Sequence, residues 1–193
     1  MKKRAVFLDR DGTINRDVGY PNSYNMVEIF PYSFAAVRKI NRAGFLSVIV
    51  TNQSGVGKGF IEEKNLRDIH RNLRLDFAKQ KATIDAIYYC PHYEYAEIPE
   101  YRKACACRKP NPGMAQQAVC DFNIDTAKSY MIGDKAEDIL FGMNIQATSI
   151  LLLTGFGQKS ISKLKEKGVE PAYVAETLKE AVDWILRREK ENP

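Results

Sequence analysis

Two aspartates, Asp9 and Asp11, stand two positions apart directly after a short apolar run near the start of the chain. Like charges this close repel each other, and a bound cation is a common way to offset the repulsion. Mg²⁺ prefers oxygen ligands and often links protein carboxylates to a substrate phosphate. The pair therefore indicates either a magnesium-dependent phosphate site or a simple turn at a strand end.

Three further polar clusters accompany the aspartate pair. Thr51 and Asn52 end another apolar run, Lys109 lies on a loop before a helical pattern, and Asp134 and Asp138 follow a third run. Taken singly, they have ordinary explanations as a polar loop, a surface lysine and the capped first turn of a helix. All four clusters in one chain favour a shared site that binds phosphate and metal.

A separate group of soft ligands occupies the middle of the chain. Cys90-x-His92 and Cys105-x-Cys107 form two close pairs with twelve residues between them. Zinc sites are typically built from two such pairs, and four protein ligands make a closed, structural site. The spacing of one residue within each pair is tighter than usual, so free thiols remain the alternative. A disulfide between Cys105 and Cys107 would be strained.

Elements that could position these residues alternate along the chain. Near-continuous apolar runs are typical of strands in a parallel sheet that is covered on both faces. Such strands are expected over Ala5–Leu8, Leu46–Thr51, Ala86–Cys90, Tyr130–Ile132 and Thr148–Leu153. Helices are expected over Phe34–Ala43, Glu62–Lys79, Gly113–Asp121, Ala136–Asn144 and Thr177–Arg188. The alternation predicts a doubly wound, mainly parallel α/β sheet, whose ligands bind beyond the carboxyl ends of the strands.

Length and charge limit the classes of protein that this chain can be. A chain of 193 residues suits one domain, residues 1–193, and its net charge of +5 is scattered rather than massed in one stripe. A small anionic substrate explains this charge without nucleic acid. No apolar run is long enough to span a membrane, and the start lacks the pattern of a secretory signal. We therefore expect a cytoplasmic protein with no membrane partner.

The four clusters together resemble the motifs of the haloacid dehalogenase superfamily phosphatases. The matching residues are Asp9-Arg10-Asp11-Gly12-Thr13, Thr51-Asn52, Lys109-Pro110 and Gly133-Asp134…Asp138. The resemblance implies that Asp9 attacks phosphorus and that Asp11 first donates and then accepts a proton. It further implies that Thr51 and Lys109 hold the transferring phosphoryl group.

The same resemblance implies a Mg²⁺ site and a domain plan. Mg²⁺ would be held by Asp9, by the backbone carbonyl of Asp11 and by Asp134, while Asp138 would orient Lys109 or a metal-bound water. The interval between Asp11 and the next strand must contain a helix, and the remainder is too short for an inserted domain. We expect no separate cap domain and an open site whose loops recognise the substrate.

The cysteine and histidine pairs beside these motifs resemble a zinc-bearing branch of the superfamily. The resemblance implies a structural Zn²⁺ held by Cys90, His92, Cys105 and Cys107, within a zinc loop of about residues 90–109. Our hypothesis is that the metal fixes this loop and thereby aims Arg108 at a substrate phosphate and Lys109 at the transferring one.

Within the branch, the motif loops resemble the heptose bisphosphate phosphatases more than the histidinol-phosphate phosphatases. The resemblance implies removal of the 7-phosphate from heptose 1,7-bisphosphate. The sequence leaves open whether the substrate is the alpha or the beta anomer. The substrate-binding residues would be Asp17, Val18, Gly19, Tyr20, Thr51, Asn52, Gln53, Ser54, Arg108, Lys109 and Lys135. Two alternatives stay open: a phosphatase for histidinol phosphate or another small ester, and a non-catalytic, zinc-stabilised binding module. An open site suits a monomer.

Four remaining features receive no role in the site. We predict a flexible loop over residues 55–59 and a small core residue at Cys120. His70 is interpreted as a surface or packing residue, and Arg187–Pro193 as a solvated tail.

Overall fold

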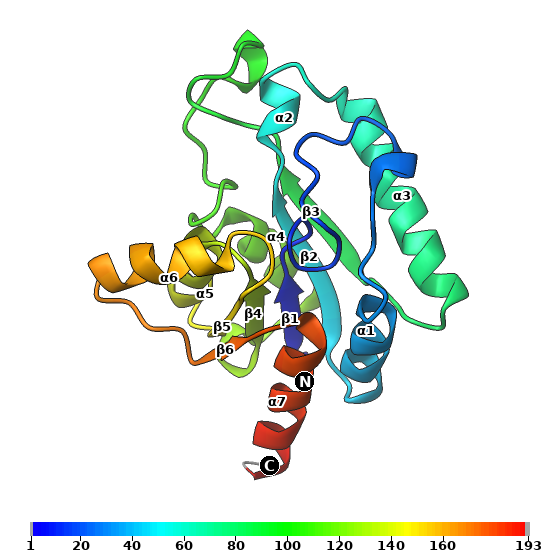
Figure 1. The fold of residues 1–193 in the computed structure, drawn as a ribbon, viewed down its shortest axis with the longest axis vertical. Helices are drawn as coiled ribbons and strands as arrows, with labels where there is room; N and C mark the ends of the chain where they lie inside the picture. The colour runs from blue at the N-terminus through cyan, green and yellow to red at the C-terminus, as the bar shows by residue number, and fades with distance from the viewer. Residues whose placement is uncertain (1, 192–193) are drawn as a thin grey trace.

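The computed structural model describes residues 2–191 and contains one six-stranded sheet in the order β3-β2-β1-β4-β5-β6 (Figure 1). All five pairs of neighbouring strands are parallel. The strands are β1 (Ala5–Leu8), β2 (Leu46–Asn52), β3 (Ala86–Cys90), β4 (Tyr130–Gly133), β5 (Thr148–Leu152) and β6 (Tyr173–Ala175). The predicted parallel α/β class is confirmed, and the described residues contain no second sheet that could form a cap.

Seven α-helices lie within residues 2–191, between the strands or after them. They are α1 (Ser33–Arg42), α2 (Ser54–Gly57), α3 (Glu63–Lys79), α4 (Gly113–Phe122), α5 (Ala136–Asn144), α6 (Gly157–Glu166) and α7 (Leu178–Glu191). Three short 3-10 helices span Tyr24–Met26, Pro99–Tyr101 and Thr126–Lys128. The five predicted helices all exist, with ends within three residues of the expected positions.

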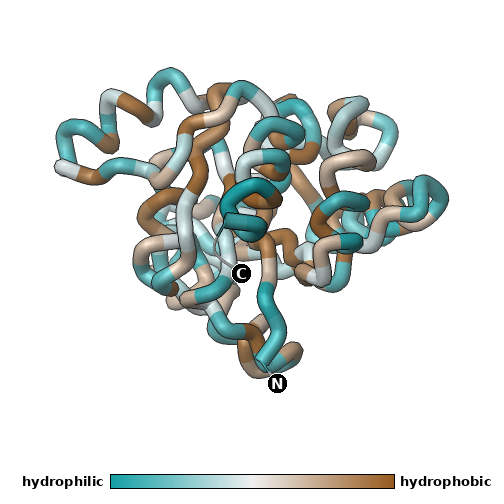
Figure 2. Tube along the Cα trace, turned by 90° about the horizontal axis from the view of Figure 1, so that it is seen from below, coloured by the Kyte–Doolittle hydropathy of each residue, from teal (hydrophilic) through white to brown (hydrophobic). Residues whose placement is uncertain are grey.

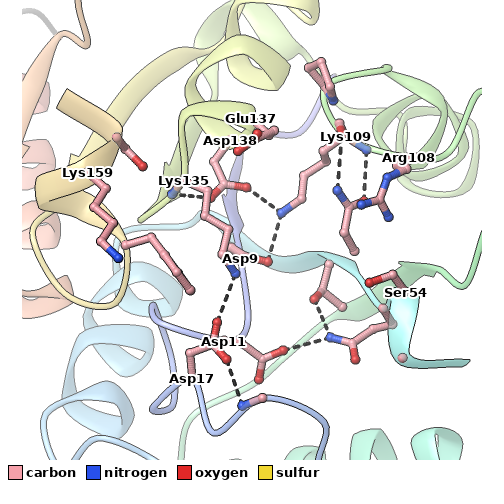
Figure 3. Close-up of a pocket in the computed structure, with 18 of the residues that line it drawn as sticks. Asp9, Asp11, Asp17, Ser54, Arg108, Lys109, Lys135, Glu137, Asp138 and Lys159 are labelled. Atoms are coloured by element: carbon pink, nitrogen blue, oxygen red, sulfur yellow. Dashed lines mark hydrogen bonds and ion pairs between the residues drawn. The ribbon is translucent and has the colours of Figure 1, made fainter. Parts of the chain in front are cut away.

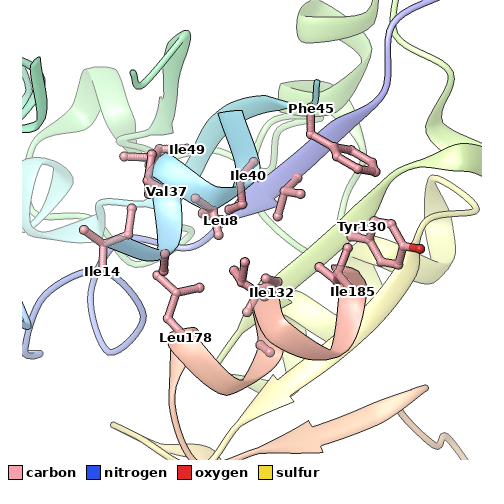
Figure 4. Packing of buried hydrophobic residues seen from close by; sticks show 14 of the residues in the cluster. Leu8, Ile14, Val37, Ile40, Phe45, Ile49, Tyr130, Ile132, Leu178 and Ile185 are labelled. Carbon is pink, nitrogen blue, oxygen red and sulfur yellow. The ribbon is translucent and has the colours of Figure 1, made fainter. Parts of the chain in front are cut away.

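The hydrophobic core lies on both faces of the central strand β1. Val6 and Leu8 lie in one buried cluster, and Ala5 and Phe7 lie in another, because successive side chains of a strand point to opposite faces. Residues of α1 and α7 pack in the first cluster around Leu8 (Figure 4). Residues of α4 and α5 fill the second cluster. The burial on both faces explains why the strands are continuously apolar.

Hydropathy follows this layering along the whole trace. Figure 2 shows hydrophobic stretches gathered inside the molecule and hydrophilic stretches on the outer helices and turns. Within residues 2–191, none of the helices has the length and apolar character needed to cross a membrane.

Besides α2 and the short 3-10 helices, the sequence analysis missed α6 and β6, whose buried faces hold few large apolar side chains. In α6 the buried residues are Gly157, Ser160 and Leu164, and the partly buried Ile161 packs in the same cluster as Leu164, so only two large apolar side chains mark its inner face. Strand β6 has three residues at the edge of the sheet, and Val174 is exposed. Hydrophobic periodicity reveals a helix or strand only when its buried positions carry apolar side chains.

Two smaller predictions were wrong. Residues 187–191 continue α7 instead of forming a tail, and Glu189 accepts hydrogen bonds from Arg4 and from the Tyr130 hydroxyl. The last two residues of the predicted tail lie outside the described part of the chain. Cys120 is exposed on α4 because the buried face of that helix is formed by Met114, Ala115 and Ala118.

The sheet order places a ligand crevice beside β1. Strands β2 and β3 extend from one side of β1, whereas β4, β5 and β6 extend from the other side. The chain therefore changes direction between β1 and β4, and crevices at such switch points are the usual ligand sites of open α/β sheets. The end of β2 and the loops after β1, β3 and β4 carry the predicted motifs to this edge.

Candidate active site

A cavity of about 800 Å³ opens at the carboxyl ends of the strands (Figure 3). Most of the residues predicted to form the site line it. These are Asp9, Asp11, Asp17, Gly19, Tyr20, Thr51, Asn52, Gln53, Ser54, Arg108, Lys109 and Lys135. Val18 is exposed and outside this lining, whereas Asp134 is completely buried beside the cavity.

Lys109 is the buried cation at the centre of the site. Its Nζ donates hydrogen bonds to Asp9 Oδ1 at 2.9 Å, Asp138 Oδ1 at 2.6 Å and the Val50 carbonyl at 2.8 Å. Burial alone would lower the pKa of Lys109, but Asp138 and Asp9 outweigh burial and raise this pKa, so the ammonium stays charged. Of the two roles expected for Asp138, the geometry supports the orientation of Lys109.

The backbone of Lys109 is held as firmly as its side chain. The Asn52 side-chain amide donates to the Lys109 carbonyl at 3.1 Å, and the Asn52 side-chain oxygen accepts from the Lys109 N–H at 3.0 Å. Asn52 ends β2, so this pair of hydrogen bonds attaches the loop after the cysteines directly to the sheet.

Three buried carboxylates form a candidate metal centre. Asp9, Asp134 and Asp138 each place an oxygen within 4.8 Å of the others. Asp134 Oδ2 accepts a hydrogen bond from the Phe156 N–H at 2.7 Å, but the buried Oδ1 has no hydrogen-bond partner among the described residues. A buried carboxylate oxygen without a donor suits a cation. The residues therefore fit a Mg²⁺ ion.

Gly12 allows the loop after β1 to approach this centre closely. Its φ is +86°, a conformation that side chains rarely adopt, and an added Cβ would lie 2.4 Å from Asp134 Oδ2. Any larger residue at position 12 would strain the backbone and displace Asp134. The glycine therefore keeps the two loops of the candidate metal centre together.

We expect Mg²⁺ to stabilise the protein more at pH 8 than at pH 5. Burial and the neighbouring Asp9 and Asp138 raise the pKa of Asp134 from 3.8 to about 8. The folded state then holds a proton that the unfolded state releases, so metal-free stability falls as the pH rises from about 4 to about 8. Bound Mg²⁺ replaces this proton and offsets the loss. Melting temperatures with and without Mg²⁺ at both pH values test this, and equal shifts would contradict it.

The Asp11 side chain is turned toward a buried arginine instead of the carboxylate cluster. Arg10 donates to both of its carboxylate oxygens, at 3.0 and 2.7 Å. Asn15 and Gln53 each add a hydrogen bond at 2.8 Å. Burial raises the pKa of Asp11, but Arg10 and these hydrogen bonds outweigh burial and lower the pKa. The carboxylate is therefore ionised and ready to accept a proton.

His70 supports this arrangement from α3. It is buried, and its Nε2 lies 3.1 Å from Arg10 Nη1. Burial and the charge of Arg10 lower the pKa of His70 to about 3, so the neutral ring accepts this hydrogen bond. The interpretation as a packing residue holds, but the sequence could not indicate a contact with Arg10, sixty positions away.

The loop after β1 forms one rim of the cavity together with Ser54 and Gly55 of α2, and two residues that follow α2 contact this loop. Lys135 Nζ lies 3.2 Å from Asp17 Oδ2, and the Tyr20 ring packs on Phe60 with centroids 4.8 Å apart. Lys58 donates to the Tyr20 hydroxyl at 2.8 Å. Residues 55–59 were predicted to be a flexible loop. In the structure, residues 55–57 belong to α2, and Lys58 contacts Tyr20 on the rim.

Cys90, His92, Cys105 and Cys107 converge as predicted from their spacing. Their ligand atoms lie within 4.8 Å of one another, and individual Sγ–Sγ and Sγ–Nδ1 distances run from 3.0 to 3.7 Å. Tetrahedral zinc with bonds of about 2.3 Å spaces its sulfur ligands roughly 3.8 Å apart. All four cysteines of the chain are free thiols. The cluster has the composition and nearly the dimensions of a zinc site.

The cysteine cluster is directly connected to the cavity wall. Arg108 follows Cys107, and its Nη1 donates to the His92 carbonyl at 3.2 Å. The Arg108 guanidinium also lies over the Tyr93 ring, 5.4 Å from its centroid. Lys109 comes next and enters the buried network described above. The position of both cations thus depends on the loop that the cluster closes.

Comparison with known proteins identifies the family of this chain. Residues 106–181 match the HAD-hydrolase-like family. A D-glycero-D-manno-heptose-1,7-bisphosphate 7-phosphatase of Thermosynechococcus vestitus is 36% identical over 189 residues, which cover 96% of each chain. A D-glycero-beta-D-manno-heptose-1,7-bisphosphate 7-phosphatase of Haemophilus ducreyi is 41% identical and covers 86% of this chain and 91% of its own.

Solved structures agree with these relatives. A D,D-heptose 1,7-bisphosphate phosphatase from B. bronchiseptica, complexed with magnesium and phosphate, superposes with a TM-score of 0.83 at 29% identity, covering 96% of this chain and 99% of its own. The chain therefore belongs to the haloacid dehalogenase-like hydrolases. Within that class it falls in the family of the heptose-1,7-bisphosphate 7-phosphatases.

Proposed function

We propose that this chain is a Mg²⁺-dependent phosphatase that removes the 7-phosphate of D-glycero-D-manno-heptose 1,7-bisphosphate and leaves the 1-phosphate. It would do so in the biosynthesis of nucleotide-activated heptose. The observation that carries the proposal is the contact between Asp9 and Lys109 beside the unpartnered oxygen of Asp134. The names of relatives that span nearly the whole chain support the substrate.

We further propose that residues 1–193 act as a single phosphatase domain and as a monomer. The cytoplasm is the proposed compartment, because its reducing conditions keep cysteine ligands as thiols. All four cysteines are free in the structure.

In the proposed reaction, an Asp9 carboxylate oxygen attacks phosphorus while the bond from phosphorus to the sugar oxygen breaks. A proton carried by Asp11 goes to the departing sugar oxygen. Ionised Asp11 then takes a proton from water, whose oxygen attacks the aspartyl phosphate, releasing inorganic phosphate and restoring Asp9. The lowered pKa keeps Asp11 ionised beside Arg10, so its part as the acid of the first step requires that the bound phosphate raise this pKa.

Lys109 and Thr51 would hold the transferring phosphoryl oxygens. Lys109 reaches Asp9 at 2.9 Å, so its positive charge lies where negative charge develops during transfer. The Thr51 hydroxyl accepts a hydrogen bond from Gln53 at 2.9 Å and can donate its own proton to a phosphoryl oxygen. Asp138 orients Lys109.

Two metals complete the proposal. Asp9, Asp134 and the Asp11 carbonyl would hold Mg²⁺, which supplies positive charge to the phosphoryl oxygens when bound. Cys90, His92, Cys105 and Cys107 would hold a structural Zn²⁺. Asp17, Val18, Gly19, Tyr20, Asn52, Gln53, Ser54, Arg108 and Lys135 are the proposed remaining substrate contacts.

Phosphate release in the presence of Mg²⁺ tests the substrate. Both anomers of heptose 1,7-bisphosphate are compared with histidinol phosphate, with Asp9→Asn as the blank. We expect a strong preference for a heptose bisphosphate, and the better anomer defines the pathway that the enzyme serves. A preference for histidinol phosphate would keep the mechanism and overturn the substrate. Absence of any Mg²⁺-dependent turnover would favour a non-catalytic binding module.

A further inference from the structure

Helix α3 carries a polar residue at a core position. Its buried residues are Leu66, Ile69, His70, Leu73 and Phe77, which follow the three- and four-residue spacing of one helix face. Burying a polar side chain costs free energy unless the side chain forms a hydrogen bond. Within residues 2–191, the His70 ring has one hydrogen-bond partner, Arg10. Neither the sequence motifs nor the proposed reaction uses His70.

The contact with Arg10 defines the tautomer of the His70 ring. An arginine side chain has donors and no acceptor, so His70 Nε2, 3.1 Å from Arg10 Nη1, must accept the hydrogen bond. The proton of the neutral ring is therefore on Nδ1. Burial and the charge of Arg10 lower the pKa of His70 to about 3, so the ring remains an acceptor near neutral pH.

Arg10 connects His70 to the Asp11 carboxylate. Its Nε and Nη2 donate to the two carboxylate oxygens, and a fork of this kind fixes the plane of the carboxylate. Nη1 is the third guanidinium nitrogen, and its hydrogen-bond partner in the described part of the chain is His70 alone. Arg10 is completely buried. Without His70, Nη1 would lack an acceptor, a state that Arg10 could relieve only by moving.

A movement of Arg10 would displace Asp11 within the active site. Asp9 and Asp11 both line the cavity (Figure 3). A side chain that transfers a proton must lie within hydrogen-bond distance of the reacting oxygen, and displacements of about 1 Å already reduce the rate strongly. The position of His70 on α3 therefore bears on proton transfer at Asp11, although His70 itself lies outside the cavity lining.

We propose that His70 is a positioning residue, which acts through Arg10 to hold the Asp11 carboxylate in the orientation that protonates the departing sugar oxygen. The inference rests on the proposed function, because it requires that Asp11 serve as the acid of the first step. It adds to that function a requirement for a residue of α3 that does not touch the substrate.

The leaving group provides a test that a purely structural role would not pass. A sugar oxygen leaves as an alcohol and needs a proton, whereas p-nitrophenol leaves readily as an anion. The values of kcat/KM for heptose 1,7-bisphosphate and p-nitrophenyl phosphate are compared, because kcat/KM covers only the steps up to release of the leaving group. For His70→Leu, we expect a fall of about tenfold or more for the bisphosphate and of less than about threefold for p-nitrophenyl phosphate.

Two further substitutions control for the loss of the ring. His70→Gln offers a carbonyl oxygen in place of Nε2, so it should restore the ratio of the two values to within about threefold of the unmodified protein. Tyr89→Phe is the matched control, because the Tyr89 ring packs on His70 with centroids 5.4 Å apart while its hydroxyl donates to Glu63. It should leave both values within about twofold.

Arg10→Lys tests the same contact from its other side. Lysine keeps the buried positive charge but lacks the fork, so it cannot join both oxygens of Asp11 to His70. We expect the same selective loss on the bisphosphate. The melting temperature of each variant establishes that it is folded, and Arg10→Lys carries the test if His70→Leu does not fold.

Asp11→Asn separates a failure of this inference from a failure of the proposed function. If Asp11→Asn impairs the bisphosphate selectively but folded His70→Leu lowers both substrates equally or neither, Asp11 is the acid and the role of His70 is refuted. A His70→Gln protein that behaves like His70→Leu, or a gain of bisphosphate turnover in His70→Leu, would also refute it. If Asp11→Asn shows no selectivity, or the unmodified protein does not hydrolyse the bisphosphate, the proposed function fails as well.

Discussion

Replacing Asp9 by asparagine should reduce Mg²⁺-dependent phosphate release by a factor on the order of 10³ or more, because the amide cannot attack phosphorus. Asparagine keeps the size of the side chain and retains an oxygen that can accept the hydrogen bond from Lys109. The loss should therefore appear in kcat and not in folding. Initial rates on the bisphosphate, together with circular dichroism and the melting temperature, provide the measurement.

A second readout separates the nucleophile from a general electrostatic role. The unmodified protein, stopped in acid during turnover, should carry phosphate on the peptide that contains Asp9, and Asp9→Asn should not. Asp68→Asn is a suitable control, because Asp68 lies on α3, outside the cavity lining, and its side chain pairs with the exposed Arg71. Turnover that persisted in a folded Asp9→Asn protein would show that water attacks phosphorus directly.

Loss of the metal from the cysteine cluster should reduce activity by a factor on the order of 10², since displacements of about 1 Å have effects of this size. Cys107→Ala removes one ligand two residues before Lys109. In the structure the Cys107 sulfur lies 3.0 Å from Cys90 and 3.2 Å from His92, so its loss opens the cluster. Metal analysis should find one zinc per chain in the unmodified protein and none in the variant.

Cys120→Ala is the matched control for this experiment. Cys120 is an exposed thiol outside the cluster, so its replacement should leave zinc content and activity unchanged. Mg²⁺ is kept in excess throughout, so that an effect on the cysteine cluster is not confused with loss of the ion at Asp9. A zinc-free, folded Cys107→Ala protein with full activity would refute the hypothesis that zinc positions Arg108 and Lys109.

Asp138 shows where the spacing of residues was informative and where it was not. Its place four residues after Asp134 is readable from the sequence, but the choice between binding Lys109 and binding a metal-associated water depends on distance. The Asp138 carboxylate lies 2.6 Å from Lys109 Nζ and also accepts from the Lys135 N–H at 2.9 Å. The Lys135 contact is the local cap of α5, whereas the Lys109 contact requires the loops after β3 and β4 to meet.

The sequence by itself determined five of the six described strands, five of the seven described α-helices and the residues that gather at the carboxyl edge of the sheet. Parallel strands buried on both faces must be continuously apolar, so their bounds are visible in a local window. Because parallel strands end on the same side, the polar residues after β1, β2 and β4 had to meet near one crevice. The two close ligand pairs also predicted the cysteine cluster without any knowledge of the fold.

Only the tertiary structure decided the partners of each side chain. Asp11 is turned toward Arg10, which in turn meets His70 from another helix, and no local pattern encodes a contact over that separation. Helix α6 packs Ser160 against the loop of Asp134, and only Ile161 and Leu164 are large apolar residues on its packed face, so the sequence analysis missed the helix. Local periodicity reports burial, whereas the pairing of charges depends on distances that only the packed chain defines.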